Sequence, residues 1–204
     1  ILELQRRRSD LYFLHSAVLE RRGRAILLAA DSGSGKSTTA WALLHHGFRY
    51  LSDELAPIDP GQMVVWPYPH ALCLKARPTA PYALPTETLD LGRTLHVPAS
   101  ALPAAALISE PLPIGALFFV RHRPELEAPT LRRIEPAEAG VRLYVAALNA
   151  LAHPHRGLDA ALRIAAAVPC LELWTTDLAV SCAAIGAAAD EALGEPRERP
   201  GIRP

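Results

Sequence analysis

The chain has 204 residues, half of them hydrophobic, and its 21 basic side chains balance its 21 acidic ones. This length and apolar content suit one domain with a buried core, and the balanced charge argues against bulk electrostatic binding to nucleic acid or to a membrane. Three widely spaced cysteines argue against a disulfide framework or a zinc site, and no apolar run reaches the roughly 18 residues of a membrane span, so we expect a cytoplasmic protein.

Apolar patterning predicts five strands in the first part of the chain, over 11–20, 25–30, 48–59, 63–66 and 70–75. The glycine–serine loop, which we define as residues 31–35, follows the second of these strands. A helix with apolar periodicity is expected directly after the loop, over 36–46. The order strand, glycine-rich loop and helix is the first indication of function.

The proline-rich segment 76–113 has little periodicity, and we expect it to form a lid-like excursion over the sheet within a single domain that spans residues 1–193. Beyond it, strands are predicted over 114–120 and 170–176, and helices over 136–152, 157–168 and 177–193. The polar tail at 194–204 is expected to be disordered. Strands mixed with helices and hairpin turns predict an α/β fold, with a mixed β-sheet flanked by helices.

The loop and the start of the helix read DSGSGKST, which is the pattern of a phosphate-binding loop (P-loop). Gly33 and Gly35 permit backbone conformations that let amides approach phosphate oxygens, and the helix directs its positive end to the same place. Lys36 is expected to reach the terminal phosphates and the Ser37 hydroxyl to ligate magnesium. The pattern departs from the usual one at Ala30, where glycine is common. The residues expected to contact the nucleotide are Ser32, Gly33, Ser34, Gly35, Lys36, Ser37 and Thr38.

Two further features are candidates for the same site. Asp53 and Glu54 follow an apolar strand, where a carboxylate can hold magnesium or take a proton from an attacking hydroxyl, although a solvated strand end is the alternative. Only two of the 21 basic residues are lysine, one in the loop pattern and the other at position 75. Lys75 is therefore a candidate to face the phosphates or the acceptor, with a plain surface charge as the alternative.

The segment from His15 to Asp59, HSAVLERRGRAILLAADSGSGKSTTAWALLHHGFRYLSDELAPID, resembles the catalytic domain of the bacterial HPr serine kinase/phosphorylase family. The histidine stands 21 residues before Lys36, as in that family, and Asp53 and Glu54 fall on its acidic pair. The resemblance implies a P-loop core like that of HPr kinases and PEP carboxykinases, using ATP and Mg²⁺ to phosphorylate a serine hydroxyl. It implies that Asp53 is the general base, that Glu54 and Ser37 assist Asp53 with magnesium, and that His15 stabilises the transferred phosphoryl group.

The resemblance is closer to shorter HPr-kinase-like proteins, some of which phosphorylate a precursor peptide such as a lasso peptide. The stretch VWPYPHALCLKARP occupies the place of the Glu-x-Arg-Gly signature that the family associates with its phosphorylase reaction. We therefore expect a protein or precursor-peptide substrate, with homo-oligomerisation left open. Two alternatives also stay open: a nucleotide-responsive binding module without phosphate transfer, and a small-molecule kinase or carboxykinase.

Overall fold

The computed structural model describes residues 7–31, 33–102 and 106–194. The strands are β1 (Tyr12–Leu14), β2 (Ser16–Arg21), β3 (Arg24–Ala29), β4 (Arg49–Ser52), β5 (Ala56–Asp59), β6 (Val64–Val65), β7 (Leu72–Leu74), β8 (Leu89–Asp90), β9 (Leu95–Val97), β10 (Leu112–His122), β11 (Thr130–Arg133) and β12 (Cys170–Thr175). The α-helices are α2 (Lys36–Leu44), α3 (Pro136–Val145), α4 (Leu158–Ala167) and α5 (Leu178–Leu193), and the 3₁₀ turns are η1 (Ala99–Ala101), η3 (Ala150–Ala152) and η4 (Pro154–Gly157). None of the helices in these ranges is long and apolar enough to cross a membrane.

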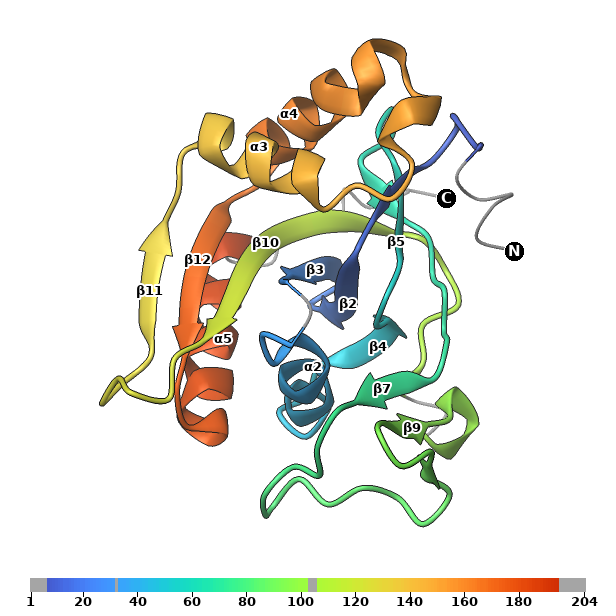
Figure 1. Cartoon of the computed structure of the whole chain (residues 1–204). Helices are drawn as coiled ribbons and strands as arrows, with labels where there is room; N and C mark the ends of the chain where they lie inside the picture. The colour runs from blue at the N-terminus through green and yellow to red at the C-terminus, as the bar shows by residue number, and fades with distance from the viewer. Residues whose placement is uncertain (1–6, 32, 103–105, 195–204) are drawn as a thin grey trace, which may run out of the picture.

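Nine strands form one mixed, curled sheet that branches along the long strand β10 (Figure 1). On one side β10 pairs in parallel with β3, which continues through antiparallel β2 to β4. On its other side, the first residues of β10 pair with β6 and the later ones pair in parallel with β12. The sheet thus confirms the mixed α/β architecture expected from the sequence.

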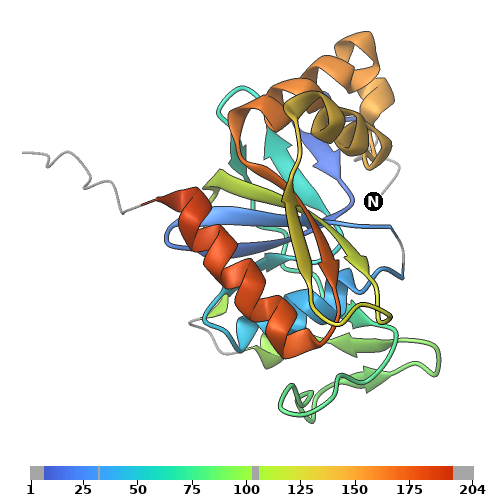
Figure 2. The same ribbon diagram turned by 90° about the vertical axis from the view of Figure 1, so that its left-hand side faces the viewer.

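The helices cover both faces of the central strands. Side chains of β3 alternate between two apolar clusters: Ile26 and Leu28 pack with α2 and α5, whereas Leu27 packs with α3 and α4. Figures 1 and 2 show these two pairs of helices apart from one another, with the sheet between them. A strand that is covered on both faces is apolar throughout, which explains the uninterrupted run over 25–30.

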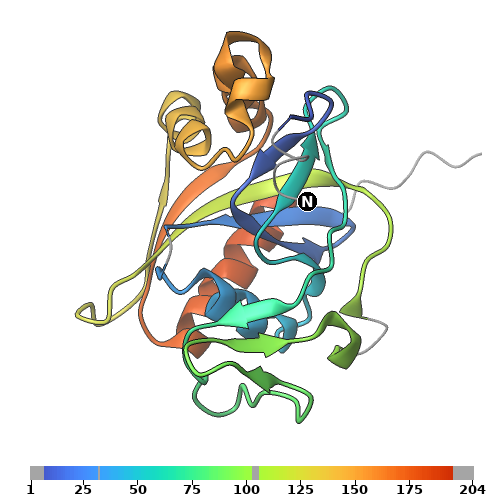
Figure 3. The ribbon, with the colours of Figure 1, turned by 45° about the vertical axis from the view of Figure 1, so that its right-hand side comes forward.

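A second, three-stranded antiparallel sheet is formed by β7, β9 and β8. It lies at the end of the molecule away from α3 and α4, next to α2 (Figure 3). Strands β7 and β9 share an apolar cluster with α2, and the Trp41 indole N–H of that helix donates to the Tyr82 carbonyl at 3.1 Å. The segment 76–113, predicted to be an excursion, supplies β8, β9, η1 and the first two residues of β10.

Two of the predicted strands are each broken by a bend. The strand predicted over 11–20 divides at His15, and the strand predicted over 48–59 divides between Ser52 and Ala56. The cause is the curl of the sheet, because β1 and β5 leave the central strands together and pair with each other. The Ser52 hydroxyl donates to the Leu55 carbonyl at 2.5 Å and closes the second bend. Both bends bring candidate residues to one place.

The helix predicted over 136–152 was too long, since α3 ends at Val145. The buried Asn149 explains the end: its amide accepts from the Phe13 N–H at 2.9 Å and donates to the Leu11 carbonyl at 2.8 Å, which turns the chain back onto β1. Strand β11 was not predicted, because all four of its residues are exposed and only its pairing with β12 defines it. Of the predicted disordered tail, residues 195–204 lie outside the described residues.

Candidate functional site

The glycine–serine loop connects the end of β3 to the first residue of α2. Gly33 and Gly35 have positive φ angles, 89° and 85°, a region that glycine enters without steric cost. Gly35 caps α2 and has no side chain, so its cap leaves the amides of the first helical turn open to another acceptor. Of the predicted nucleotide contacts, Ser32 lies outside the described residues. The local geometry is that of an anion-binding helix N-terminus.

Lys36 and Asp53 form a buried ion pair beside this loop. The Lys36 ammonium lies 3.1 Å from the Asp53 Oδ1 atom and 2.5 Å from the Asp53 carbonyl oxygen. The two side chains are 7% and 0% exposed. The Cys73 backbone N–H donates to the second carboxylate oxygen of Asp53 at 3.1 Å. The bend after β4 therefore places Asp53 beside Lys36. Each carboxylate oxygen of Asp53 has a hydrogen-bond partner.

His15 lies half-buried at the bend between β1 and β2 and faces the acidic pair. Its Nδ1 is 3.2 Å from the Glu54 carbonyl oxygen, which can only accept, so Nδ1 is the donor in this contact. The Glu54 side chain itself is exposed. The structure thus brings together three residues that the sequence suggested for one site: His15, Asp53 and Glu54.

Lys75 directly follows β7 and reaches over the glycine–serine loop. Its ammonium lies 3.6 Å from the place that a Cβ atom on Gly33 would take. Lys75 and Lys36, the two lysines of the chain, therefore approach the loop from different elements. The small sheet that carries β7 is what delivers the second ammonium to the loop.

Two side chains at the carboxyl end of β10 also flank the loop, and sequence reasoning did not single them out. Arg121 lies 4.0 Å from the Asp31 carboxylate, and the Cβ atom of His122 is 3.8 Å from the place that a Cβ on Gly35 would take. A usable signal existed, since β10 was predicted as a buried strand and ligands commonly bind beyond the carboxyl ends of parallel strands. The parallel pairing of β10 with β3 places both residues there.

Cys73 lies near the acidic pair but is unsuited to act as a nucleophile. Burial raises the pKa of its thiol, and the negative charges of Glu54 and Asp53 raise it further. A thiol with a raised pKa stays protonated at neutral pH, and the thiolate is the reactive form. The chemistry of the site therefore falls to its carboxylates, cations and histidine.

The donor set fits a magnesium ion that is held mainly by a bound phosphate. Within the described residues, no group of three or more His, Cys, Asp or Glu side chains is arranged to hold a metal by itself. Magnesium in nucleotide sites commonly uses one or two carboxylates, with phosphate oxygens and water completing its shell. Ser37, in the first turn of α2, and the carboxylates of Asp53 and Glu54 offer that chemistry.

A comparison with protein-family models finds no match, and a comparison with curated proteins finds none either. Among solved structures, the chain is similar to the Hpr(Ser) kinase/phosphatase from Coxiella burnetii, with a TM-score of 0.43 and 12% sequence identity. The similarity covers 86% of this chain and 95% of that one. At this distance it is a likeness of overall fold alone.

Proposed function

We propose that the protein is an ATP- and Mg²⁺-dependent kinase that phosphorylates a serine hydroxyl of a protein or precursor peptide. The observation that carries this proposal is the buried pair of Lys36 and Asp53 beside the uncapped amides of α2. A lysine that can reach terminal phosphates and a carboxylate that can take a hydroxyl proton are the two groups that phosphate transfer requires of the protein. The resemblance of residues 15–59 to HPr kinases supports serine as the acceptor.

The triphosphate binds to the glycine–serine loop through backbone amides, the positive end of α2 and two ammonium groups. Lys36 reaches the site from inside the protein, and Lys75 reaches it from the small sheet. Such groups are already in place before the reaction, so they neutralise the charge of the transferred phosphoryl group without reorganising. Positioning and charge neutralisation account for most of the catalysis in this class of reaction.

Nucleotide binding would also free the general base, Asp53, from its contact with Lys36. The Lys36 ammonium contacts Asp53 Oδ1, and the Asp53 side chain is fully buried. When Lys36 turns to the phosphates, Oδ1 is free to accept a proton while the Cys73 N–H keeps the other oxygen in place. The acceptor oxygen then bonds to the terminal phosphorus, the bond from that phosphorus to the β-phosphate oxygen breaks, ADP leaves, and the hydroxyl proton passes to Asp53.

Magnesium would be held by Ser37, Asp53 and Glu54 together with the phosphates, and it would supply charge neutralisation there. His15 has a different role. The Glu54 carbonyl accepts from its Nδ1–H, and the cationic form of the ring, with a second proton on Nε2, would donate from Nε2 to a phosphoryl oxygen. Both contributions depend on the same bend after β4, because it carries Asp53 and Glu54.

The substitution Asp53→Asn tests the proposal. It keeps the size of the side chain but removes the base, so transfer of labelled phosphate from ATP to serine peptides should fall by about 100-fold or more. Saturable MgATP binding should persist, as measured by calorimetry, because Lys36 and the amides of the loop are kept. Asp59→Asn, at the last residue of β5, is the matched control and should leave transfer unchanged. Undiminished transfer by Asp53→Asn would remove Asp53 from this role.

The full burial of Asp53 favours one other function, a nucleotide-responsive binding module that does not transfer phosphate. In that case Lys36 would exchange partners on nucleotide binding and alter the packing of the small sheet on α2. Incubation with γ-labelled ATP and serine peptides separates the two functions. Nucleotide binding without any labelled peptide would favour the module.

A further inference from the structure

A cavity of about 540 Å³ lies beside the glycine–serine loop, on the side of the sheet that α3 covers. Its wall includes Ala29 to Asp31 at the start of the loop, the end of β10, the last turn of α3 and His15. His15 also contacts the backbone of Glu54, so the cavity adjoins the acidic pair as well as the loop. The cavity therefore shares His15 and the start of the loop with the proposed site of phosphate transfer.

The position of His15 indicates which end of a bound nucleotide the cavity would meet. For transfer to occur, the terminal phosphate must face the base, Asp53, and the histidine next to it. The nucleoside lies at the opposite end of the phosphate chain. A cavity lined by His15 therefore adjoins the terminal phosphate and is open to the acceptor rather than to the nucleoside.

One wall of the cavity is aliphatic and exposed. Val141 and Val145 stand one helical turn apart on α3 and are 57% and 78% exposed, and Leu148 follows them at 36%. Exposed aliphatic side chains that gather in a concave surface beside a reactive site are typical of a ligand-binding wall. The wall is suited to an aliphatic side chain of the occupant.

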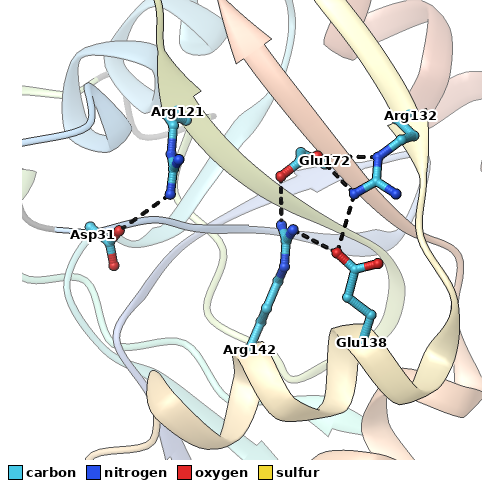
Figure 4. A network of polar contacts seen from close by, with 6 residues as sticks. All are labelled: Asp31, Arg121, Arg132, Glu138, Arg142 and Glu172. Atoms are coloured by element: carbon cyan, nitrogen blue, oxygen red, sulfur yellow. Dashed lines mark hydrogen bonds and ion pairs between the residues drawn. The ribbon is translucent and has the colours of Figure 1, made fainter.

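The charged wall of the cavity is neutralised by its own ion pairs (Figure 4). Arg142 lies 2.6 Å from Glu138 and 2.9 Å from Glu172, and its guanidinium is 5.3 Å from the centre of the Phe119 ring. Burial opposes ionisation of Glu172, yet hydrogen bonds from Arg132 and Arg142 hold its pKa below the usual value. Arg121 and Asp31 form the other pair. Equal numbers of positive and negative side chains give the cavity no preference for a charged occupant.

We propose that this cavity binds the acceptor as a peptide segment that carries an aliphatic side chain next to the phosphorylated serine. The inference rests on the proposed kinase function and adds the class of acceptor sequence. The serine hydroxyl lies toward His15 and Asp53, and the neighbouring aliphatic side chain packs on Val141 and Val145. The ion pair of Arg142 with Glu172 ties α3 to β12 on the other side of the cavity.

The test uses the whole protein, γ-labelled ATP and three pools of serine peptides, in which the residues next to serine are aliphatic, acidic or basic. The aliphatic pool should be labelled at least about tenfold faster than the acidic and basic pools, because a single methylene in a matched apolar pocket changes the rate by about 10–200-fold. Val145→Glu should lower labelling of the aliphatic pool about tenfold and favour the basic pool. Its MgATP affinity should be unchanged.

Val180→Glu is the matched control, because Val180 is 52% exposed on α5 and lies outside the lining of the cavity. It should behave as the unsubstituted protein does. Equal labelling of the three pools, or equal losses in both variants, would overturn the inference. Weaker MgATP binding by Val145→Glu would do so too, because it would place the nucleoside in the cavity. Nucleotide binding with no labelled pool would instead overturn the kinase function and favour the binding module. Failure of the unsubstituted protein to bind MgATP would also overturn the kinase function itself.

Discussion

Two ion pairs flank the glycine–serine loop, and they differ in almost every physical respect. Lys36 and Asp53 are 7% and 0% exposed and 3.1 Å apart, whereas Arg121 and Asp31 are 54% and 84% exposed and 4.0 Å apart. A buried pair is expensive to break from one side, because the remaining charge stays in a low-dielectric environment. An exposed pair contributes roughly 0–1 kcal/mol and exchanges readily with water.

The difference assigns a separate task to each pair. The inner pair holds Lys36 and Asp53 in place beside the loop. A bound phosphate can offset the separation of the pair, because it gives Lys36 another negatively charged partner. The outer pair costs little to separate, so Arg121 is available to turn toward a phosphate at the start of the loop. We therefore expect large effects from changes to the inner pair and small effects from changes to the outer pair.

The largest effect is expected for Lys36→Met. It removes the ammonium that contacts the phosphates and leaves Asp53 buried without its cation, so MgATP binding should be lost and the free energy of unfolding should fall by about 3–5 kcal/mol. Calorimetry and urea unfolding measure the two effects.

The double variant Lys36→Met, Asp53→Asn is the control for that stability loss. It removes the uncompensated charge, so it should recover at least about half of the lost unfolding free energy while still failing to bind nucleotide. No recovery would mean that the inner pair is not the source of the loss.

A smaller effect is expected for Arg121→Ala. If Arg121 turns to the terminal phosphate, the variant should bind ATP about five- to tenfold more weakly and bind ADP as before, because only ATP carries that phosphate. Folding should change by less than about 0.5 kcal/mol, since Arg121 is exposed. Arg123→Ala, two residues further on, is the control and should change neither affinity. Equal losses for ATP and ADP would contradict the assignment.

The part of the site that is local in sequence could be predicted, because short-range geometry decides it. Gly33, Gly35 and Lys36 lie within four residues, between a strand and a helix whose apolar patterns are legible. The acidic pair could also be placed, since it follows a predicted strand. The bends at His15 and after Ser52 could not, because they result from the pairing of β1 with β5 across the curl of the sheet.

The outer half of the site depends on contacts that are distant in sequence. Arg121 reaches the loop only because β10 pairs in parallel with β3. Helix α3 lines the cavity only because Asn149 turns the segment after the helix back onto β1. Strand β11 shows the same limit, since its exposed residues carry no apolar alternation. The apolar pattern of a segment indicates its own conformation, but the partner of that segment depends on the rest of the chain.

The central claim is that the amides of the glycine–serine loop and Lys36 bind a nucleoside triphosphate. Titration of the intact, folded protein with MgATP in a calorimeter tests it most directly, with Lys36→Met measured beside it. The account predicts saturable binding of one nucleotide per chain that disappears in the variant. Absence of binding by the unsubstituted protein, or equal binding by both, would contradict it.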